Sequence, residues 1–100
     1  MKKLESLEQF EQLKQEEKVI FLFTADCRVI EPFLPTLETE FAEYEFVTID
    51  RDEFIDLCSQ LDIFGIPSFV AFSKGTETGR FVSKNRKTKE EIEEFINSLT

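Results

Sequence analysis

Two thiols, Cys27 and Cys58, are the side chains best suited to chemistry in this sequence, because the chain contains no histidine. The lack of histidine excludes Ser-His and Cys-His triads, histidine general bases and histidine-based zinc sites. Cys27 lies where an apolar run, Val19 to Ala25, gives way to apolar residues at helical spacing. A thiol at the start of a helix meets unpaired backbone N–H groups and the positive end of the helix dipole, and both favour the thiolate. We therefore expect thiol chemistry at Cys27; the alternative is an inert, buried cysteine.

The second thiol has a simpler interpretation. Cys58 shares helical spacing with Phe54, Leu57 and Leu61, which predicts a small apolar residue of the core. Its functional alternative is a backup disulfide with Cys27, which requires the two Cα atoms to lie within about 7 Å of each other.

Hydrophobic spacing also predicts the elements before and after Cys27. Ser6 and Gln9 form a capping box for a first helix. The apolar face of that helix comprises Leu4, Leu7, Phe10 and Leu13. The unbroken apolar run within 18–25 predicts a strand that is covered on both faces. A second helix is predicted from near Asp26 to about Tyr44, with a kink near Pro32.

The second half of the chain predicts three more strands and two helices. A strand at 45–50 runs parallel to the first, because a full helix connects them. A short helix over 54–61 follows, with Asp50 or Asp52 as its cap. The strand 68–72, a turn at 73–78 and the strand 79–83 predict an antiparallel hairpin. A capping box at Thr88 and Glu91 opens the last helix, whose buried stripe comprises Ile92, Phe95, Ile96 and Leu99. The fold class is therefore α/β, with a four-stranded mixed sheet flanked by helices in the order α-β-α-β-α-β-β-α.

Composition and charge limit the classes of partner. A chain of 100 residues predicts one domain over 1–100. The net charge of −9 would repel nucleic acid and anionic membranes. No apolar run resembles a secretory signal or a membrane span, so two cysteines predict free thiols in the reducing cytoplasm rather than a disulfide framework. We expect a monomer that holds neither cofactor nor metal.

The order of these elements, together with short motifs, resembles the thioredoxin fold. In thioredoxins the first long strand ends in Phe-x-Ala-x-Trp-Cys-x-x-Cys, a proline-kinked helix follows, and a cis-proline from an Ile-Pro pair faces the two cysteines. The similar stretches here are Phe23-Thr24-Ala25-Asp26, Cys27-Arg28-Val29-Ile30-Glu31-Pro32 and Gly65-Ile66-Pro67-Ser68, with Gly75 in the hairpin turn. The resemblance covers nearly the whole chain from Leu7 onward and implies a thioredoxin-like fold.

The sequence departs from the family inside the redox motif. Cys27 matches the second, resolving cysteine, whereas the first, nucleophilic cysteine and its tryptophan are missing. Leu22 stands near the place of a buried acid that many thioredoxins carry. Three interpretations stay open: a natural single-thiol variant, a deletion, or a loop at the junction of Asp26 and Cys27 that the molecule carries and this sequence does not contain.

The resemblance implies a thiol-disulfide oxidoreductase that reduces protein disulfides. Cys27 would be the equivalent of the resolving cysteine, and Ile66 with a cis Pro67 would be the platform for an extended substrate. The implied partners are disulfide-containing proteins and a thiol or disulfide reductase. With Cys27 alone, exchange would be monothiol, with glutathione or another thiol resolving the mixed disulfide. The alternative is a redox-inactive or monothiol module that binds peptides or partner proteins through the same groove, and without the resemblance Pro67 simply begins a strand.

Overall fold

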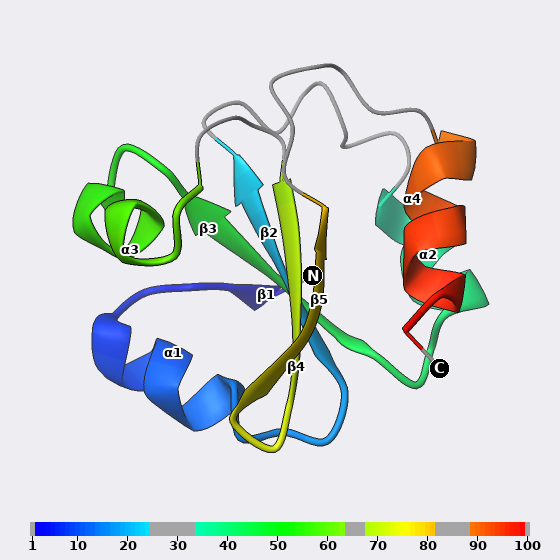
Figure 1. Ribbon diagram of the computed structural model, residues 1–100, viewed down its shortest axis with the longest axis horizontal. Coiled ribbons are helices and arrows are strands. Elements are labelled where there is room, and N and C mark those ends of the chain that lie inside the picture. Colours follow the sequence, from blue (N-terminus) through cyan, green and yellow to red (C-terminus); the bar gives the residue numbers. More distant parts are fainter. Residues whose placement is uncertain (1, 25–33, 64–67, 82–88, 100) are drawn as a thin grey trace.

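The protein is described by a computed structural model that covers residues 2–24, 34–63, 68–81 and 89–99 (Figure 1). Its strands are β1 (Lys2–Lys3), β2 (Val19–Thr24), β3 (Glu45–Asp50), β4 (Ser68–Ser73) and β5 (Thr76–Phe81). They form one sheet in the order β1-β3-β2-β4-β5. β1 and β2 run parallel to β3, whereas β4 runs antiparallel to β2 and β5. The predicted mixed sheet is confirmed, and the structure adds the edge strand β1, whose 2 residues are too short to show a hydrophobic pattern.

Helices cover both faces of this sheet. They are α1 (Leu7–Leu13), α2 (Leu34–Glu40), α3 (Ile55–Gln60) and α4 (Lys89–Asn97). Figure 1 shows α1 and α3 together on one side of the sheet, and α2 and α4 together on the other. The layers are therefore helix, sheet, helix, the arrangement in which a central strand is buried on both faces.

The central strand β2 joins the two halves of the core. All of its apolar residues are fully buried, as the unbroken apolar run predicts. Alternate side chains point to opposite faces of a strand, so Val19, Phe21 and Phe23 pack under α1 and α3. Ile20 and Leu22 pack on the other face, against apolar residues of α2 and α4. The buried stripe of the last helix is confirmed at Ile92 and Ile96, with Phe95 and Leu99 partly buried beside them.

The first helix begins later than its apolar spacing suggests. Ser6 is the N-cap, and its hydroxyl accepts the backbone N–H of Gln9 at 3.1 Å, so the predicted capping interaction is confirmed. Leu4 precedes the cap and is buried because its own N–H pairs with the carbonyl of Thr48 at 2.8 Å, which extends the strand region of β1. Leu7 is 52% exposed. The prediction of one apolar helix face was thus wrong for Leu4 and Leu7, because β-pairing fixes the chain before the helix starts.

The β4–β5 connection is shorter than predicted. Ser73 pairs with Thr76, which leaves only Lys74 and Gly75 in the turn, and both have positive φ, +53° and +86°. Positive φ at both central residues is the type I′ pattern that matches the twist of a hairpin. β5 therefore starts at Thr76, three residues earlier than the predicted strand 79–83, whose last residues lie outside the described ones.

Two helix boundaries also differ from the sequence prediction. α2 ends at Glu40 rather than near Tyr44, and the predicted kink at Pro32 lies outside the described residues. Neither predicted acid caps α3, because its N-cap is Phe54 and has no side-chain capping bond. Asp50 instead accepts the N–H groups of Asp52 and Glu53 at 2.9 and 3.4 Å, so it stabilises the turn that precedes the helix.

Candidate functional site

Two strands end and a third strand begins at the same edge of the sheet, the edge formed by the carboxyl ends of the parallel strands β2 and β3. The parallel strands β2 and β3 finish together, with Thr24 opposite Asp50, and the Arg51 N–H donates to the Thr24 carbonyl at 3.0 Å. β4 starts at the same edge, because Ser68 is opposite Phe23 in the antiparallel ladder. Ligands of open α/β sheets bind beyond the carboxyl ends of parallel strands. This edge is therefore the candidate functional site, as the sequence prediction requires.

The residues predicted to carry the chemistry lie beside these ends in sequence. Cys27 lies three residues after Thr24, and Ile66 and Pro67 directly precede Ser68. All three lie outside the described residues, so their geometry stays a prediction. The described flanks are firmly placed: Thr24 and Ser68 are both buried in the ladder.

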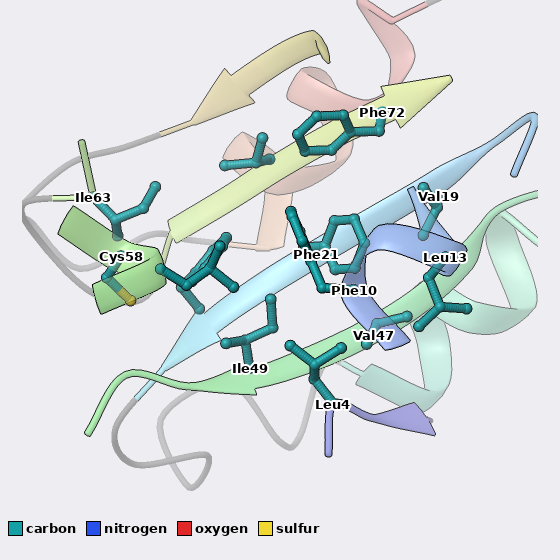
Figure 2. Packing of buried hydrophobic residues seen from close by; sticks show 13 residues of the cluster. Leu4, Phe10, Leu13, Val19, Phe21, Val47, Ile49, Cys58, Ile63 and Phe72 are labelled. Atoms are coloured by element: carbon teal, nitrogen blue, oxygen red, sulfur yellow. The ribbon is translucent and has the colours of Figure 1, made fainter. Parts of the chain in front are cut away.

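The second thiol is described and lies in the core. Cys58 is a free cysteine on α3, 3% exposed, and belongs to the apolar cluster under α1 and α3. Figure 2 shows Cys58 beside Ile63, at the opposite end of the cluster from Phe72 and Val19. The prediction that Cys58 is a small core residue is confirmed. Whether it can form a disulfide with Cys27 is not tested, because Cys27 lies outside the described residues.

The surroundings of Cys58 hold it in the thiol form. Burial raises the pKa of Cys58 above its ordinary value of 9.0; among nearby charges Arg51 lowers this pKa, while Asp50 and Asp52 raise it. A pocket of about 310 Å³ lies beside the thiol, lined by Arg51, Ile55, Cys58, Ser59, Asp62 and Ile63. Because the nucleophile in disulfide exchange is the thiolate, Cys58 is poorly suited to attack a disulfide at neutral pH.

The described part of the chain contains neither a cluster of metal-binding side chains nor a helix that could cross a membrane. No group of three or more Asp, Glu, Cys or His side chains among the described residues is arranged to hold a metal ion. Within those same residues, no helix combines the length and apolar character that crossing a bilayer requires.

One contact near the site was missed from the sequence. Arg80, on β5, donates to the backbone carbonyl of Leu61 at the end of α3, over 2.8 Å. It also binds both carboxylate oxygens of Glu77, at 3.0 and 2.6 Å. Glu77 and Arg80 are three residues apart, a spacing that places side chains on opposite faces of a regular strand, so no pattern in the sequence signals the pair.

Comparison with known proteins agrees with this geometry. The thioredoxin family model matches residues 2–98. The chain is 33% identical to thioredoxin from Sus scrofa over 73% of this chain and 67% of that protein. It is also similar to the crystal structure of oxidised mitochondrial thioredoxin 3 from Saccharomyces cerevisiae, with a TM-score of 0.83 and 26% identity over 98% of this chain and 94% of that one.

A second yeast structure is similar over the same extent. It concerns the thiol resolving mechanism of a mitochondrial 1-Cys peroxiredoxin via the glutathione and thioredoxin systems, and it matches with a TM-score of 0.79 and 25% identity over 98% of this chain and 94% of that one. The mixed sheet with helices on both faces, the meeting of β2, β3 and β4 at one edge, and these matches lead to one conclusion: the chain belongs to the thioredoxin family.

Proposed function

We propose that this protein reduces disulfides of partner proteins by monothiol exchange at Cys27, with Ile66 and Pro67 as the platform for the extended substrate. Membership of the thioredoxin family supports a thioredoxin-like redox function. Thioredoxins act on disulfide-containing proteins and are themselves reduced by reductases. In this chain we assign Cys27 to the place of the resolving cysteine, because it lies three residues after Thr24, the last residue of β2.

The proposed reaction needs two external thiols from solution. The Cys27 thiolate attacks one sulfur of the substrate disulfide, forms a mixed disulfide and releases the other sulfur as a thiolate, which takes up a proton. A low-molecular-weight thiol such as glutathione then attacks the Cys27 sulfur of the mixed disulfide, which releases the second substrate sulfur as a thiolate and leaves Cys27 in a disulfide with the external thiol. A second equivalent of that thiol regenerates Cys27. In total, two external thiols supply two electrons and two protons and leave as one disulfide, and the substrate gains two thiols.

The observation that carries this proposal is the strand register at the site. Thr24 opposite Asp50, and Phe23 opposite Ser68, bring the chain that continues to Cys27 beside the chain that arrives from Pro67. Three residues span at most about 11 Å when extended, and this short reach supports a place for Cys27 near this edge. The antiparallel register is decisive, because a parallel β4 would start at the other end of β2.

An external resolving thiol follows from the position of Cys58. This second cysteine is buried, and its raised pKa keeps it protonated, so it is poorly suited to resolve a mixed disulfide. The similar yeast structure concerned with 1-Cys peroxiredoxin resolution via the glutathione and thioredoxin systems supports the choice of this class of thiol. We also propose a cytoplasmic location, because exchange of this kind needs a reducing pool of free thiols.

Cys27→Ser tests the proposal, with Cys58→Ala as the matched control. Wild-type protein, reduced glutathione and insulin as the protein disulfide are combined, and thiol release is followed together with the mass of the mixed disulfide. We expect Cys27→Ser to lose at least about 100-fold in rate, since a hydroxyl does not replace a thiolate nucleophile. We expect Cys58→Ala to keep the wild-type rate. A wild type without turnover, or turnover that survives Cys27→Ser, would contradict the proposal.

The same experiment separates the binding-module alternative. The missing nucleophilic cysteine is the observation that favours a module. If the protein is a binding module, the wild type and Cys27→Ser bind partner peptides equally tightly, and neither shows turnover.

Intact mass tests the junction of Asp26 and Cys27: a mass of 11.7 kDa agrees with a direct bond, and a heavier chain would indicate further residues there.

A further inference from the structure

Arg80 forms a link between the edge strand β5 and the end of α3. Its Nε and Nη2 donate to the two carboxylate oxygens of Glu77 at 3.0 and 2.6 Å. Its Nη1 donates to the backbone carbonyl of Leu61 at 2.8 Å. A bidentate bond fixes the plane of a guanidinium, so Glu77 orients the group that reaches Leu61.

A β-bulge makes this arrangement possible. Ala71 pairs with Gly79, whereas the next residue, Phe72, pairs with Glu77, so Thr78 is the extra residue in β5. Residues three apart normally point to opposite faces of a strand. The extra residue shifts that alternation by one, which brings Glu77 and Arg80 to the same face, the one covered by α1 and α3.

The Leu61 carbonyl belongs to a closely defined helix end. Ile63 donates its N–H to the carbonyl of Cys58 at 2.9 Å, and Asp62 donates to the carbonyl of Ser59 at 3.2 Å. Asp62 has φ +57°. These two bonds and the left-handed residue form a Schellman motif, which satisfies carbonyls at the end of a helix. Arg80 adds a partner for the carbonyl of Leu61, the C-cap residue.

This helix end leads directly to the proposed substrate platform. After Ile63, which is buried in the core, four residues reach Ser68, and Ile66 and Pro67 are two of them. Ser68 is fixed at the far end of this stretch by its place opposite Phe23 in the sheet. The near end is fixed by the Schellman motif and by Arg80. Binding of an extended chain depends on backbone groups that are held in place before the partner arrives.

We infer that Arg80, oriented by Glu77, is a positioning residue that holds the α3 end of the platform segment for protein substrates. This inference rests on the proposed function, because it concerns the same Ile66 and Pro67 platform. Arg80 touches neither the reacting sulfurs nor the substrate; it acts through Leu61. The side chains of Arg80 and Glu77 are 35% and 36% exposed, so the pair contributes little to global stability. Its effect belongs to substrate binding.

Arg80→Met tests the inference, with Lys14→Met as a control that removes the same charge from the C-cap of α1. Lys14 is chosen because it contacts Glu11 and the Phe10 ring, and its carbonyl accepts the N–H of Gly75 in the turn after β4, at the other end of that strand from Ser68. Both variants are assayed with insulin, which presents a peptide chain, and with bis(2-hydroxyethyl) disulfide, which does not. We expect Arg80→Met to raise KM for insulin about three- to tenfold, as for loss of a charged hydrogen bond in part exposed to water. We expect kcat and the rate with the small disulfide to stay within about twofold.

Hydrogen exchange gives an independent readout of the mechanism. The amides of Asp62 and Ile63 donate the two Schellman bonds, so we expect them to exchange faster in Arg80→Met and at the wild-type rate in Lys14→Met. Arg80→Lys keeps the charge but lacks the planar fork, so its KM for insulin should rise in the same direction. This second variant decides the matter if Arg80→Met unfolds.

The outcomes distinguish this inference from the proposed function. If the wild type reduces neither disulfide, the proposed function is wrong and the inference is overturned with it. If the wild type is active but Arg80→Met keeps its KM for insulin, or loses equally on both substrates, the positioning role alone is overturned. A higher KM confined to insulin, with faster exchange at Asp62 and Ile63, supports it.

Discussion

At the scale of single residues, the environment of Cys58 suits a core residue and not a nucleophile. Cys58 is enclosed by apolar side chains of the core and faces two nearby carboxylates, Asp50 and Asp52, that oppose its ionisation. A thiol in such a place is protected from oxidants and alkylating reagents because little of it is ionised. Core packing is therefore the role of Cys58, and the proposed exchange depends on Cys27.

The first prediction concerns Cys58 and alkaline pH. The folded-state pKa of Cys58 is raised above its ordinary value of 9.0, so this group contributes stability that is fully present below the unfolded pKa and is lost as the pH rises through the folded pKa. We expect the urea midpoint of the wild type to fall more steeply above pH 9 than that of Cys58→Ala. At pH 7 the substitution should cost about 1 kcal/mol, as for a small loss of core volume.

Tyr44 also lowers the stability of the fold at alkaline pH, and its effect must be separated from that of Cys58. Burial, with a smaller effect of Glu43, raises its pKa above the ordinary 10.0, so it also weakens the fold at high pH. Cys58→Ala retains Tyr44, and the difference between the two pH profiles isolates the thiol. Parallel profiles from pH 7 to pH 11 would show that Cys58 ionises equally easily in the folded and unfolded chains.

At the scale of elements, the ring of Phe10 connects α1 to two strands of the sheet. Phe10 packs against Phe21 of β2 and Phe72 of β4, with ring centroids 4.8 and 5.9 Å apart. Phe21 and Phe72 are themselves in edge contact at 5.7 Å. The three rings form one aromatic group from three elements. In such a group each ring adds specific geometry to the apolar area that it buries.

The second prediction follows from this aromatic group. We expect Phe10→Ala to lower the free energy of unfolding by about 3 to 4 kcal/mol, the range for truncating a buried phenylalanine. Leu7→Ala is the control on the same helix, because Leu7 is 52% exposed, and it should change stability by less than about 0.5 kcal/mol. Urea unfolding monitored by circular dichroism measures both. Equal losses would mean that Leu7 belongs to the packed face after all.

The edge strand β5 shows the same dependence on neighbouring elements. Gly79 faces α4, and a Cβ built there would lie 2.6 Å from Cδ2 of Leu99. Glycine at this position therefore lets Leu99, two residues after α4, approach the strand closely. The bulge one residue earlier brings Arg80 to the opposite face, where it reaches Leu61. One short stretch of β5 thus adjusts to helices on both sides of the sheet.

At the scale of the whole molecule, the net charge of −9 is the main long-range property. It steers association with charged partners over roughly the Debye length, about 10 Å at 0.1 M salt. The charge adds nothing to the exchange chemistry itself. If the proposed exchange is correct, the charge selects among protein disulfides before contact is made.

The third prediction therefore concerns salt. If the proposed exchange is correct, kcat/KM for a basic protein disulfide should fall as sodium chloride rises from 0.02 to 0.5 M, by about three- to tenfold, because screening removes the attraction. For an acidic protein disulfide it should rise. An uncharged small disulfide is the control and should show no trend. The same trend for basic and acidic substrates would contradict electrostatic steering by this chain.

Much of the fold could be predicted because the relevant signals are local. The unbroken apolar run gave β2 as a doubly covered strand, and 45–50 matched β3 residue for residue. The capping residue of α1 and the buried stripe of α4 were also read correctly. The predicted turn at 73–78 is too long, because strand register pairs Ser73 with Thr76 and composition does not reveal register. Similarly, the apolar spacing places Leu4 on a helix. Its backbone pairing with Thr48 depends on a distant strand and leaves no signal in the local sequence.

The candidate site divides in the same way. Sequence alone determined that any redox chemistry must use a thiol, that Cys27 follows the central strand, and that an Ile-Pro pair precedes another strand, since residue types and their order are fixed by the chain. Only the tertiary structure decided that the ends of β2 and β3 and the start of β4 share one edge, that Cys58 is buried, and that Arg80 reaches Leu61. The physical reason is that strand register, burial and a bulge depend on residues far apart in the sequence, and local periodicity carries no record of them.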